Sequence, residues 1–207
     1  KHIEYAVSQK IPCVLVNSYS DKLPSVLSDN RKGAYLAGRY LIEHGHKTVA
    51  LLAGVRSYLS NQERTAGFLQ AFQEEGLSIP PELILETGSW LYDAAEKVCL
   101  NFFNTYTGEM PTALFAFNDR LATGAINAIC KTGRTVPDDV SVIGYDNLGY
   151  YNIISPRITT VETHIEAISE STVMHMIWQL NNGSCLPVKV LTPVEVISGE
   201  TVRSLLC

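Results

Sequence analysis

Short apolar runs alternate with longer amphipathic segments along this chain, and this alternation most constrains its fold. The runs at 11–17, 48–53, 113–117 and 140–145 contain few polar residues and have the length of single strands. Segments of about 12 to 16 residues with helical spacing of their apolar residues lie between the later runs. A run that is apolar throughout indicates a strand buried on both faces, which is typical of parallel sheets. The alternation therefore predicts an α/β fold built from βαβ units.

The remaining elements follow from the same periodicity and from turn residues. Further strands are expected at 25–29, 84–86, 158–161 and 188–197, the last broken by Pro193. Ser60 and Glu63 have the spacing of a capping box, which predicts that a helix begins at Ser60. Helices are expected at 32–44, 60–75, 91–106, 119–131 and 165–180.

Composition excludes several classes of protein. The 207 residues are 46% hydrophobic and carry a net charge of −5, so the chain is predicted to be globular, with one or two domains. It contains no apolar run of the roughly 18 residues that a membrane span needs. An acidic chain of this kind is not expected to grip nucleic acid by itself.

Cysteine and histidine spacing gives no metal or redox signal. The five cysteines include no C-x-x-C pair, and Cys13, Cys99 and Cys130 lie among apolar residues. We interpret these three as small buried hydrophobic residues of a reducing compartment. The pair His44 and His46 is expected to serve as a helix cap and a surface group, and no metal or cofactor is predicted.

Known catalytic and nucleotide-binding signatures are absent from the sequence. There is no G-x-G-x-x-G, no P-loop and no G-x-S-x-G, and no residues form an evident acid–base pair or triad. This absence favours a binding protein over an enzyme. Ligands of open parallel sheets bind outside the carboxyl ends of the strands, so functional residues are expected at 54–60, 88–90, 118–119 and 146–147.

At this point the sequence resembles the lactose/purine repressor family of transcriptional regulators. Several motifs carry the resemblance through their order and spacing together, over about residues 11–198. They are GRYLIEHGHK at 38–47 with VALLAG at 49–54, RTAGF at 64–68, PTA at 111–113, FND at 117–119, ATGA at 122–125, VPDDVSVIGYDN at 136–147 and PRITTV at 156–161.

The resemblance implies a type I periplasmic-binding-protein-like fold: two parallel-sheet lobes with helices on both faces, three chain crossovers and a small ligand between the lobes. By similarity, residues 1–30 and 163–188 belong to the N-terminal lobe, and residues 31–162 and 189–207 to the C-terminal lobe. The chain starts in the middle of the family's pattern. The first part of the N-terminal lobe and a DNA-binding headpiece are therefore expected to precede it. Val14, Val16 and parts of the 165–180 helix should then expose apolar surface or hide it against another chain.

The resemblance also implies ligand-binding residues. Arg64 matches an arginine that can donate two hydrogen bonds to hydroxyls or a carboxylate. Trp90 matches an aromatic residue that stacks on the ligand. Asp146 ends a strand and can accept hydrogen bonds from hydroxyls. One of Asn118 and Asp119 is expected to cap the following helix and the other, more readily Asn118, to face the ligand. Ser60 and, less strongly, Tyr58 complete the set.

The function implied is that of an effector-binding domain. The effector is expected to be a sugar rather than a purine, DNA is contacted only through the headpiece, and the intact protein is a cytoplasmic homodimer without membrane contact. The alternative is a periplasmic sugar-binding protein of a transporter, and an enzyme on a similar fold is disfavoured. The sequence departs from the family pattern at 196–200, which lacks a basic residue, and at the aromatic segment 149–151.

Overall fold

A computed structural model describes residues 2–149, 155–183 and 186–206, so the aromatic segment at 150–151 and Cys185 and Cys207 lie outside the described residues. The chain divides into two compact units. Unit 1 comprises residues 1–30 and 163–194, and unit 2 comprises residues 31–162 and 195–207. The chain thus passes between the units three times.

Unit 2 is built on a six-stranded sheet. Its strands have the order β4-β3-β5-β6-β7-β9, and all neighbours are parallel except β9, which runs antiparallel to β7. This arrangement confirms the predicted βαβ organisation. The strands are β3 (Val49–Ala53), β4 (Ile84–Glu86), β5 (Ala113–Ala116), β6 (Ser141–Asp146), β7 (Thr159–Glu162) and β9 (Glu195–Ile197).

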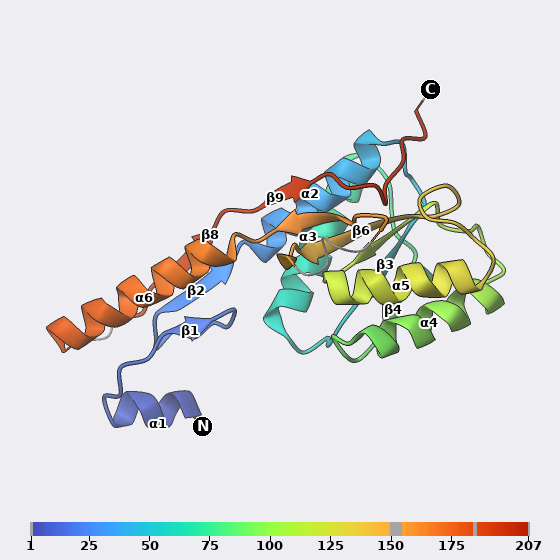
Figure 1. Cartoon of the computed structure of the whole chain (residues 1–207). Helices are drawn as coiled ribbons and strands as arrows, with labels where there is room; N and C mark the ends of the chain where they lie inside the picture. The colour runs from blue at the N-terminus through green and yellow to red at the C-terminus, as the bar shows by residue number, and fades with distance from the viewer. Residues whose placement is uncertain (1, 150–154, 184–185, 207) are drawn as a thin grey trace. The chain divides into compact units, whose positions relative to one another are not determined.

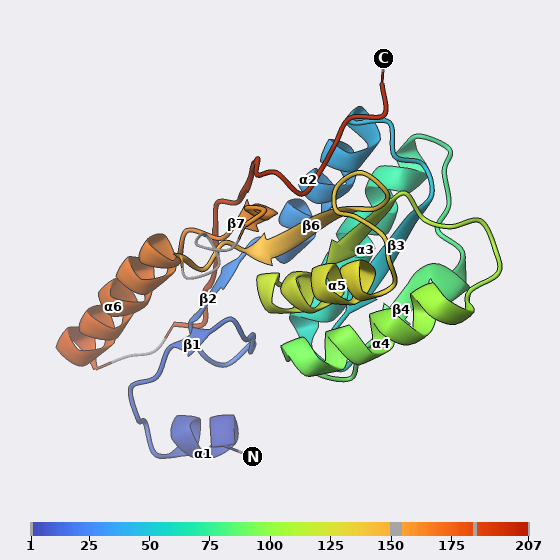
Figure 2. The ribbon, with the colours of Figure 1, turned by 45° about the vertical axis from the view of Figure 1, so that its right-hand side comes forward.

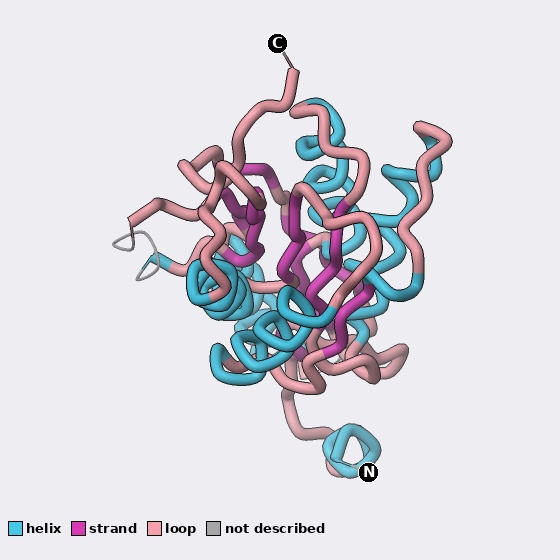
Figure 3. Tube along the Cα trace, turned by 90° about the vertical axis from the view of Figure 1, so that its right-hand side faces the viewer, coloured by secondary structure: helices cyan, strands magenta, loops and turns pink. Residues whose placement is uncertain are grey.

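Helices cover both faces of this sheet. The helices α2 (Asn30–Glu43) and α3 (Leu59–Glu74) lie on one face, and α4 (Tyr92–Thr105) and α5 (Asp119–Lys131) lie side by side on the other (Figures 1 and 2). A short 3₁₀ helix, η1 (Pro81–Leu83), precedes β4. Figure 3 shows the strands of the sheet, in magenta, enclosed by these helices. The fold is thus the predicted α/β architecture with helices on both faces of a mainly parallel sheet.

The core of unit 2 explains why the apolar runs were continuous. Every residue of β3 and of β5 is buried, as strands covered by helices on both faces require. On α5, the buried residues recur with the spacing of one helical face. Gly124 lies where α5 meets α4, and a Cβ there would approach the carbonyl oxygen of Tyr92 to 2.5 Å. The absence of a side chain at this position lets the two helices pack closely.

Unit 1 contains a smaller, three-stranded parallel sheet of order β1-β2-β8. Its elements are α1 (His2–Ser8), β1 (Leu15–Val16), β2 (Ser25–Ser28), α6 (Ile165–Asn182) and β8 (Lys189–Thr192). The buried side chain of Gln179 joins α6 to the segment before β1. Its Oε1 accepts from the Cys13 backbone N–H at 3.1 Å, and its Nε2 donates to the Cys13 carbonyl at 2.9 Å.

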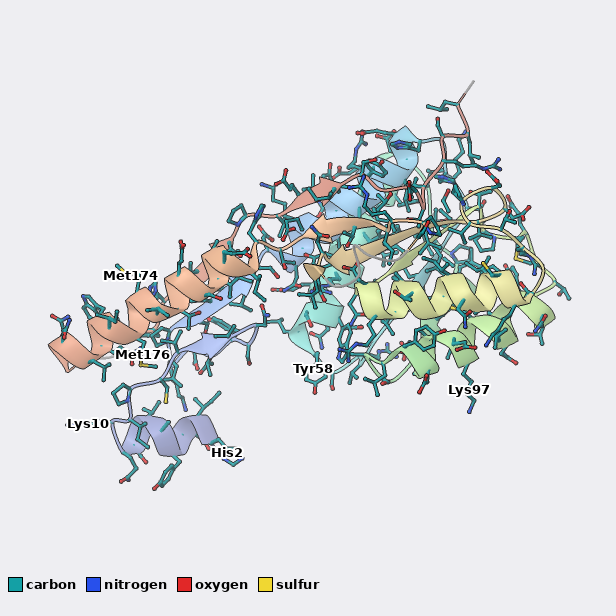
Figure 4. All side chains as sticks on the ribbon, viewed as in Figure 1. His2, Lys10, Tyr58, Lys97, Met174 and Met176 are labelled. Atoms are coloured by element: carbon teal, nitrogen blue, oxygen red, sulfur yellow. The ribbon has the colours of Figure 1, made fainter. Side chains whose placement is uncertain are left out.

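Unit 1 exposes apolar side chains, as predicted. Val16 on the edge strand β1 is 47% exposed, while Val14 is half-buried. On α6, Met174 is 67% exposed, and Figure 4 shows Met174 and Met176 projecting from the helix. Val173, Ile177, Trp178 and Leu180 of the same helix are also exposed.

Four local predictions were wrong, and one of them concerns His46, which was expected to be a cap or surface group but is buried. The strand expected over 11–17 is only Leu15–Val16, because it forms the edge of a small sheet rather than a doubly covered strand. The predicted capping box is not formed, because α3 begins at Leu59 with Tyr58 as N-cap and without a side-chain cap bond. Residues 189–194 belong to unit 1, since β8 pairs with β2 and not with the larger sheet.

The cysteines fit their predicted role only in part. Cys99 is buried, and burial raises the pKa of its thiol to about 12, whereas Cys13 is half-buried and Cys130 is exposed. Among the described residues, no helix combines the length and apolar character that crossing a bilayer requires.

Candidate functional site

The topology of unit 2 picks out one edge of its sheet. From β3 the chain crosses to β4 on one side, whereas β5 pairs with the other side of β3. The connections that follow β3 and β5 therefore diverge at their carboxyl ends, and such switch points are where open α/β sheets bind ligands. The loops that follow β3, β4, β5 and β6 all begin at this edge, because these strands are parallel.

Arg64 is the most constrained of the predicted site residues. It lies on α3, is 7% exposed, and its guanidinium carbon stands 3.6 Å from the centroid of the Tyr145 ring. Its Nη1 donates to the backbone carbonyl of Phe117, at the end of β5, and its Nη2 lies 3.1 Å from Asp146 Oδ1. A guanidinium held by a ring, a carbonyl and a carboxylate has a fixed orientation.

Asp146 ends β6 in an unusual backbone conformation. Its φ is +100° and that of Asn147 is +51°, so two successive residues other than glycine lie in the left-handed region. The Asp146 side chain remains 27% exposed. Desolvation raises the pKa of Asp146, and the neighbouring Arg64 opposes that shift. The carboxylate therefore faces both the guanidinium and solvent.

Trp90 packs over the end of β3. A Cβ on Gly54 would come within 2.6 Å of the indole, so the ring lies directly against this glycine. The loop after β3 is fixed by Asn61, whose Oδ1 accepts from the Gly54 N–H at 2.9 Å. The ring of Tyr58 lies 6.2 Å from that of Trp90, between centroids, and Tyr58 is 54% exposed at the beginning of α3 (Figure 4).

Ser60 lies on the first turn of α3 and is half-buried. The switch-point edge therefore carries one fixed guanidinium, one carboxylate and two neighbouring aromatic rings.

Asn118 and Asp119 divide their roles differently from the prediction. Asn118 is the N-cap of α5, because its Oδ1 accepts from the Leu121 N–H at 2.7 Å. Its Nδ2 lies 3.5 Å from the carbonyl oxygen of Trp90. Asn118, which we expected to face the ligand, thus serves the helix, although one of the pair does cap α5 as predicted.

Asp119 is directed into the protein. It is 2% exposed, and its Oδ1 accepts from Thr160 Oγ1 at 2.6 Å. Burial, helped by the charge of Asp146, raises the pKa of Asp119 to about 7, although the bonds from Thr160 and from the backbone of Asn147 and Leu148 act to lower it. Direct contact between this buried carboxyl and a ligand does not fit its position.

Several residues of the edge escaped the sequence analysis. Tyr145 supports Arg64, Asn61 fixes the loop after β3, and Glu162 accepts through Oε2 from Nδ2 of Asn147, which was itself among the expected strand-end residues. Tyr145 directly precedes Asp146 and could have been found by its place at the strand end. Asn61 and Glu162 gave no signal, since their partners are set by the fold. Within the described residues, no cluster of histidine, cysteine or acidic side chains could hold a metal ion.

A mainly parallel α/β unit with a fixed guanidinium, a carboxylate and aromatic rings at its switch point defines a small-molecule binding domain. Comparison with known proteins agrees with this class. The family model of the periplasmic binding protein-like domain matches residues 39–202. The chain is 31% identical to the probable HTH-type transcriptional repressor ExuR of Bacillus subtilis, over 97% of this chain and 60% of ExuR. It is 33% identical to the HTH-type transcriptional repressor PurR of Pasteurella multocida, over 94% of this chain and 58% of PurR.

Solved structures give the same result. A putative transcriptional regulator LacI from Bacillus cereus subsp. cytotoxis superposes with a TM-score of 0.89 at 26% identity, covering 98% of this chain and 72% of that one. The lac repressor dimer bound to operator and the anti-inducer ONPF superposes with a TM-score of 0.82 at 26% identity, covering 94% and 57%. The chain therefore belongs to the periplasmic binding protein-like domain family, as an effector-binding domain of the LacI type. It spans between 58% and 60% of the length of the two curated relatives named above.

Proposed function

We propose that this chain is the effector-sensing part of a transcriptional repressor, and that its effector binds at the switch-point edge of unit 2. The observation that carries the proposal is the Arg64–Asp146 pair, which stands 3.1 Å apart at that edge with Asp146 partly exposed. Curated relatives that cover nearly the whole of this chain are named as transcriptional repressors, which favours this function over transport or catalysis.

The chemistry of the edge favours a sugar as the effector. Asp146 can accept hydrogen bonds from hydroxyls, and the Trp90 ring offers an apolar face to the C–H side of a pyranose or furanose. Because Asp146 already neutralises Arg64, an uncharged polyol suits the pair better than an anion. A purine is the second candidate, supported by the relatives named PurR and by the flat aromatic surface at Trp90.

The binding residues proposed are Arg64, Asp146 and Trp90, with Ser60 at the margin. Asn118 is proposed to support the edge as the N-cap of α5. Asp119 is proposed to support it from the protein interior, without contacting the effector. For the intact protein we propose DNA binding through a separate headpiece, a homodimeric state and a cytoplasmic location. Unit 2 is proposed as the C-terminal lobe and unit 1 as part of the N-terminal lobe.

Calorimetric titration tests the proposal. Neutral aldoses, their acid derivatives and purine bases are titrated into the intact protein, and the compound that binds is titrated into Arg64→Ala and Asp146→Asn. Each variant is expected to weaken binding at least about tenfold, as loss of a charged hydrogen-bond partner does. The matched controls Lys97→Ala and Asp138→Asn change exposed residues away from the edge and should bind as the wild type does. Unaltered affinity in both site variants would overturn the proposed site.

A further inference from the structure

Asp119 is a buried carboxyl whose partners all come from this chain. Its side chain accepts from the Thr160 hydroxyl at 2.6 Å and from the backbone N–H groups of Asn147 and Leu148. These three donors stabilise the buried carboxyl, because burying a carboxylate is costly unless its oxygens are hydrogen-bonded. The ligand proposed above makes no use of this group.

The path of the Asp119 side chain crosses the sheet. Asp119 is the first residue of α5, and it reaches over Gly144 of β6 to Thr160 of β7, the register partner of Gly144. A Cβ at Gly144 would lie 2.2 Å from Asp119 Oδ1. Only glycine at this position leaves room for the carboxyl to pass. One side chain therefore joins a helix start, two strands and the turn that follows β6.

The turn that Asp119 contacts is strained. Asp146 and Asn147 have φ values of +100° and +51°, and residues other than glycine adopt such conformations only at an energetic cost. Conformations of this kind persist only where the surroundings hold them. Of the N–H groups that donate to Asp119, one belongs to Asn147, itself a strained residue, and the other to Leu148, which follows it.

We propose that Asp119 is a positioning residue of the effector site, whose carboxylate holds the Asp146–Leu148 turn in the conformation that presents Asp146 to Arg64. The inference rests on the proposed function for the role of Asp146, whereas the anchoring of the turn is a property of the chain alone. Asparagine cannot replace Asp119, because its amide nitrogen would meet an N–H donor where a carboxylate oxygen now accepts.

The charge on Asp119 bears on this role. Burial raises its pKa to about 7, so its protonation changes near neutrality. The charged groups around it are Asp146 on β6, Arg64 on α3, which is paired with Asp146, and Glu162 at the end of β7, which accepts from Asn147. Protonation would weaken the bonds from the two N–H groups, since charge-assisted hydrogen bonds are roughly twice as strong as neutral ones.

Amide NMR of the whole 207-residue chain, without any ligand, tests the inference. In the wild type, the amide signals of Asn147 and Leu148 should titrate between pH 5 and 9 together with the Asp119 carboxyl. In Asp119→Asn that titration should vanish, and hydrogen exchange at the two amides should accelerate at least about tenfold while exchange within β3 stays unchanged.

Thr160 supplies an independent variant. Thr160→Val removes the hydroxyl donor and should move the Asp119 titration to higher pH, whereas Thr160→Ser should restore the wild-type midpoint. Exchange that stays slow at residues 147 and 148 in folded Asp119→Asn, or amide signals that do not follow the carboxyl, would overturn the inference. Since no effector is added, these outcomes are separate from the success or failure of the proposed binding site.

Discussion

The Nη2 of Arg64 lies 3.1 Å from Oδ1 of Asp146, across the carboxyl ends of β5 and β6. Arg64 lies on the helix α3 and Asp146 at the end of the strand β6, 82 residues apart in the sequence. Tyr145 holds the guanidinium from one side, and Phe117 accepts from it through its carbonyl. The pair is therefore both a structural link within unit 2 and its proposed ligand contact.

Removing Arg64 should destabilise the protein. Arg64→Met keeps the length of the side chain but takes the donors from a buried carbonyl and from Asp146, so the free energy of unfolding should fall by about 2–4 kcal/mol. Asp146→Asn should cost less, about 1–2 kcal/mol, because that carboxylate is partly exposed. Urea denaturation of both variants and of the double variant measures the coupling. Strictly additive effects would show that the pair does not act as a unit.

Gly144 should tolerate no side chain. A Cβ at this position meets Asp119 Oδ1 at 2.2 Å, so Gly144→Ala should lower the free energy of unfolding by about 1–3 kcal/mol through overpacking. Among the residues that the structure describes, no atom lies within 4 Å of the corresponding Cβ position at Gly149, and Gly149→Ala serves as the control with an effect below about 0.5 kcal/mol. Thermal and chemical unfolding compare the two. Equal effects would mean that Asp119 does not pass over residue 144.

Two predicted caps should differ in their contribution to stability. Asn118 accepts from the Leu121 N–H, so Asn118→Ala should cost about 0.5–2 kcal/mol. Ser60 lies inside the first turn of α3 and does not cap it, so Ser60→Ala should stay within about 0.5 kcal/mol. If urea unfolding showed a larger loss for Ser60→Ala, the sequence-based capping box would be right and the observed start of α3 wrong.

His46 should make the protein less stable in mild acid. Its ring is buried between Thr112 and the carbonyl of Arg203, at 3.0 Å from each, and burial lowers its pKa. As pH falls below about 6.5, the unfolded chain takes up this proton before the folded chain does, so the free energy of unfolding decreases by up to about 1.4 kcal/mol per pH unit.

The contribution of His46 to the pH dependence of stability is obtained by subtracting the profile of His46→Gln from that of the wild type. Asp119 acts with the opposite sign, because its raised pKa of about 7 makes the folded state bind the proton more tightly between about pH 4 and 7. The wild-type stability profile minus that of His46→Gln should therefore rise with pH from 5 to 6.5. The control His2→Gln, on exposed α1, should leave the profile of the wild type unchanged. A flat difference would contradict a buried neutral imidazole.

The sequence predicted the elements of unit 2 well, for a physical reason. Strands such as β3 and β5 are covered on both faces, so nearly all of their residues are apolar and they appear in the sequence as continuous apolar runs. The edge strand β1 shows the limit, since its apolar run resembles a core strand although Val16 is exposed. Pro193 signalled a break in the last strand, but nothing local could assign β8 to the smaller sheet.

The site was predictable where it depends on strand ends and not where it depends on distant partners. Asp146 was expected from its place at a strand end and Arg64 only from the family resemblance, and the structure brings the two together. Asn118 and Asp119 can both cap a helix, so their neighbourhood alone could not separate them. The choice is set by Thr160, 41 residues after Asp119, and by the free space over Gly144.

The position of the effector is the central claim, and the two tryptophans of the chain allow it to be measured directly. Trp90 lies at the switch-point edge of unit 2, and Trp178 is exposed on α6 of unit 1. The indole N–H signals of the protein, assigned with Trp90→Phe, are followed in ¹⁵N-edited NMR during titration with the compound that binds in calorimetry. If the effector binds at the switch-point edge, the Trp90 signal shifts in proportion to occupancy and by far more than that of Trp178. A bound compound that shifts Trp178 and leaves Trp90 unmoved would contradict that position.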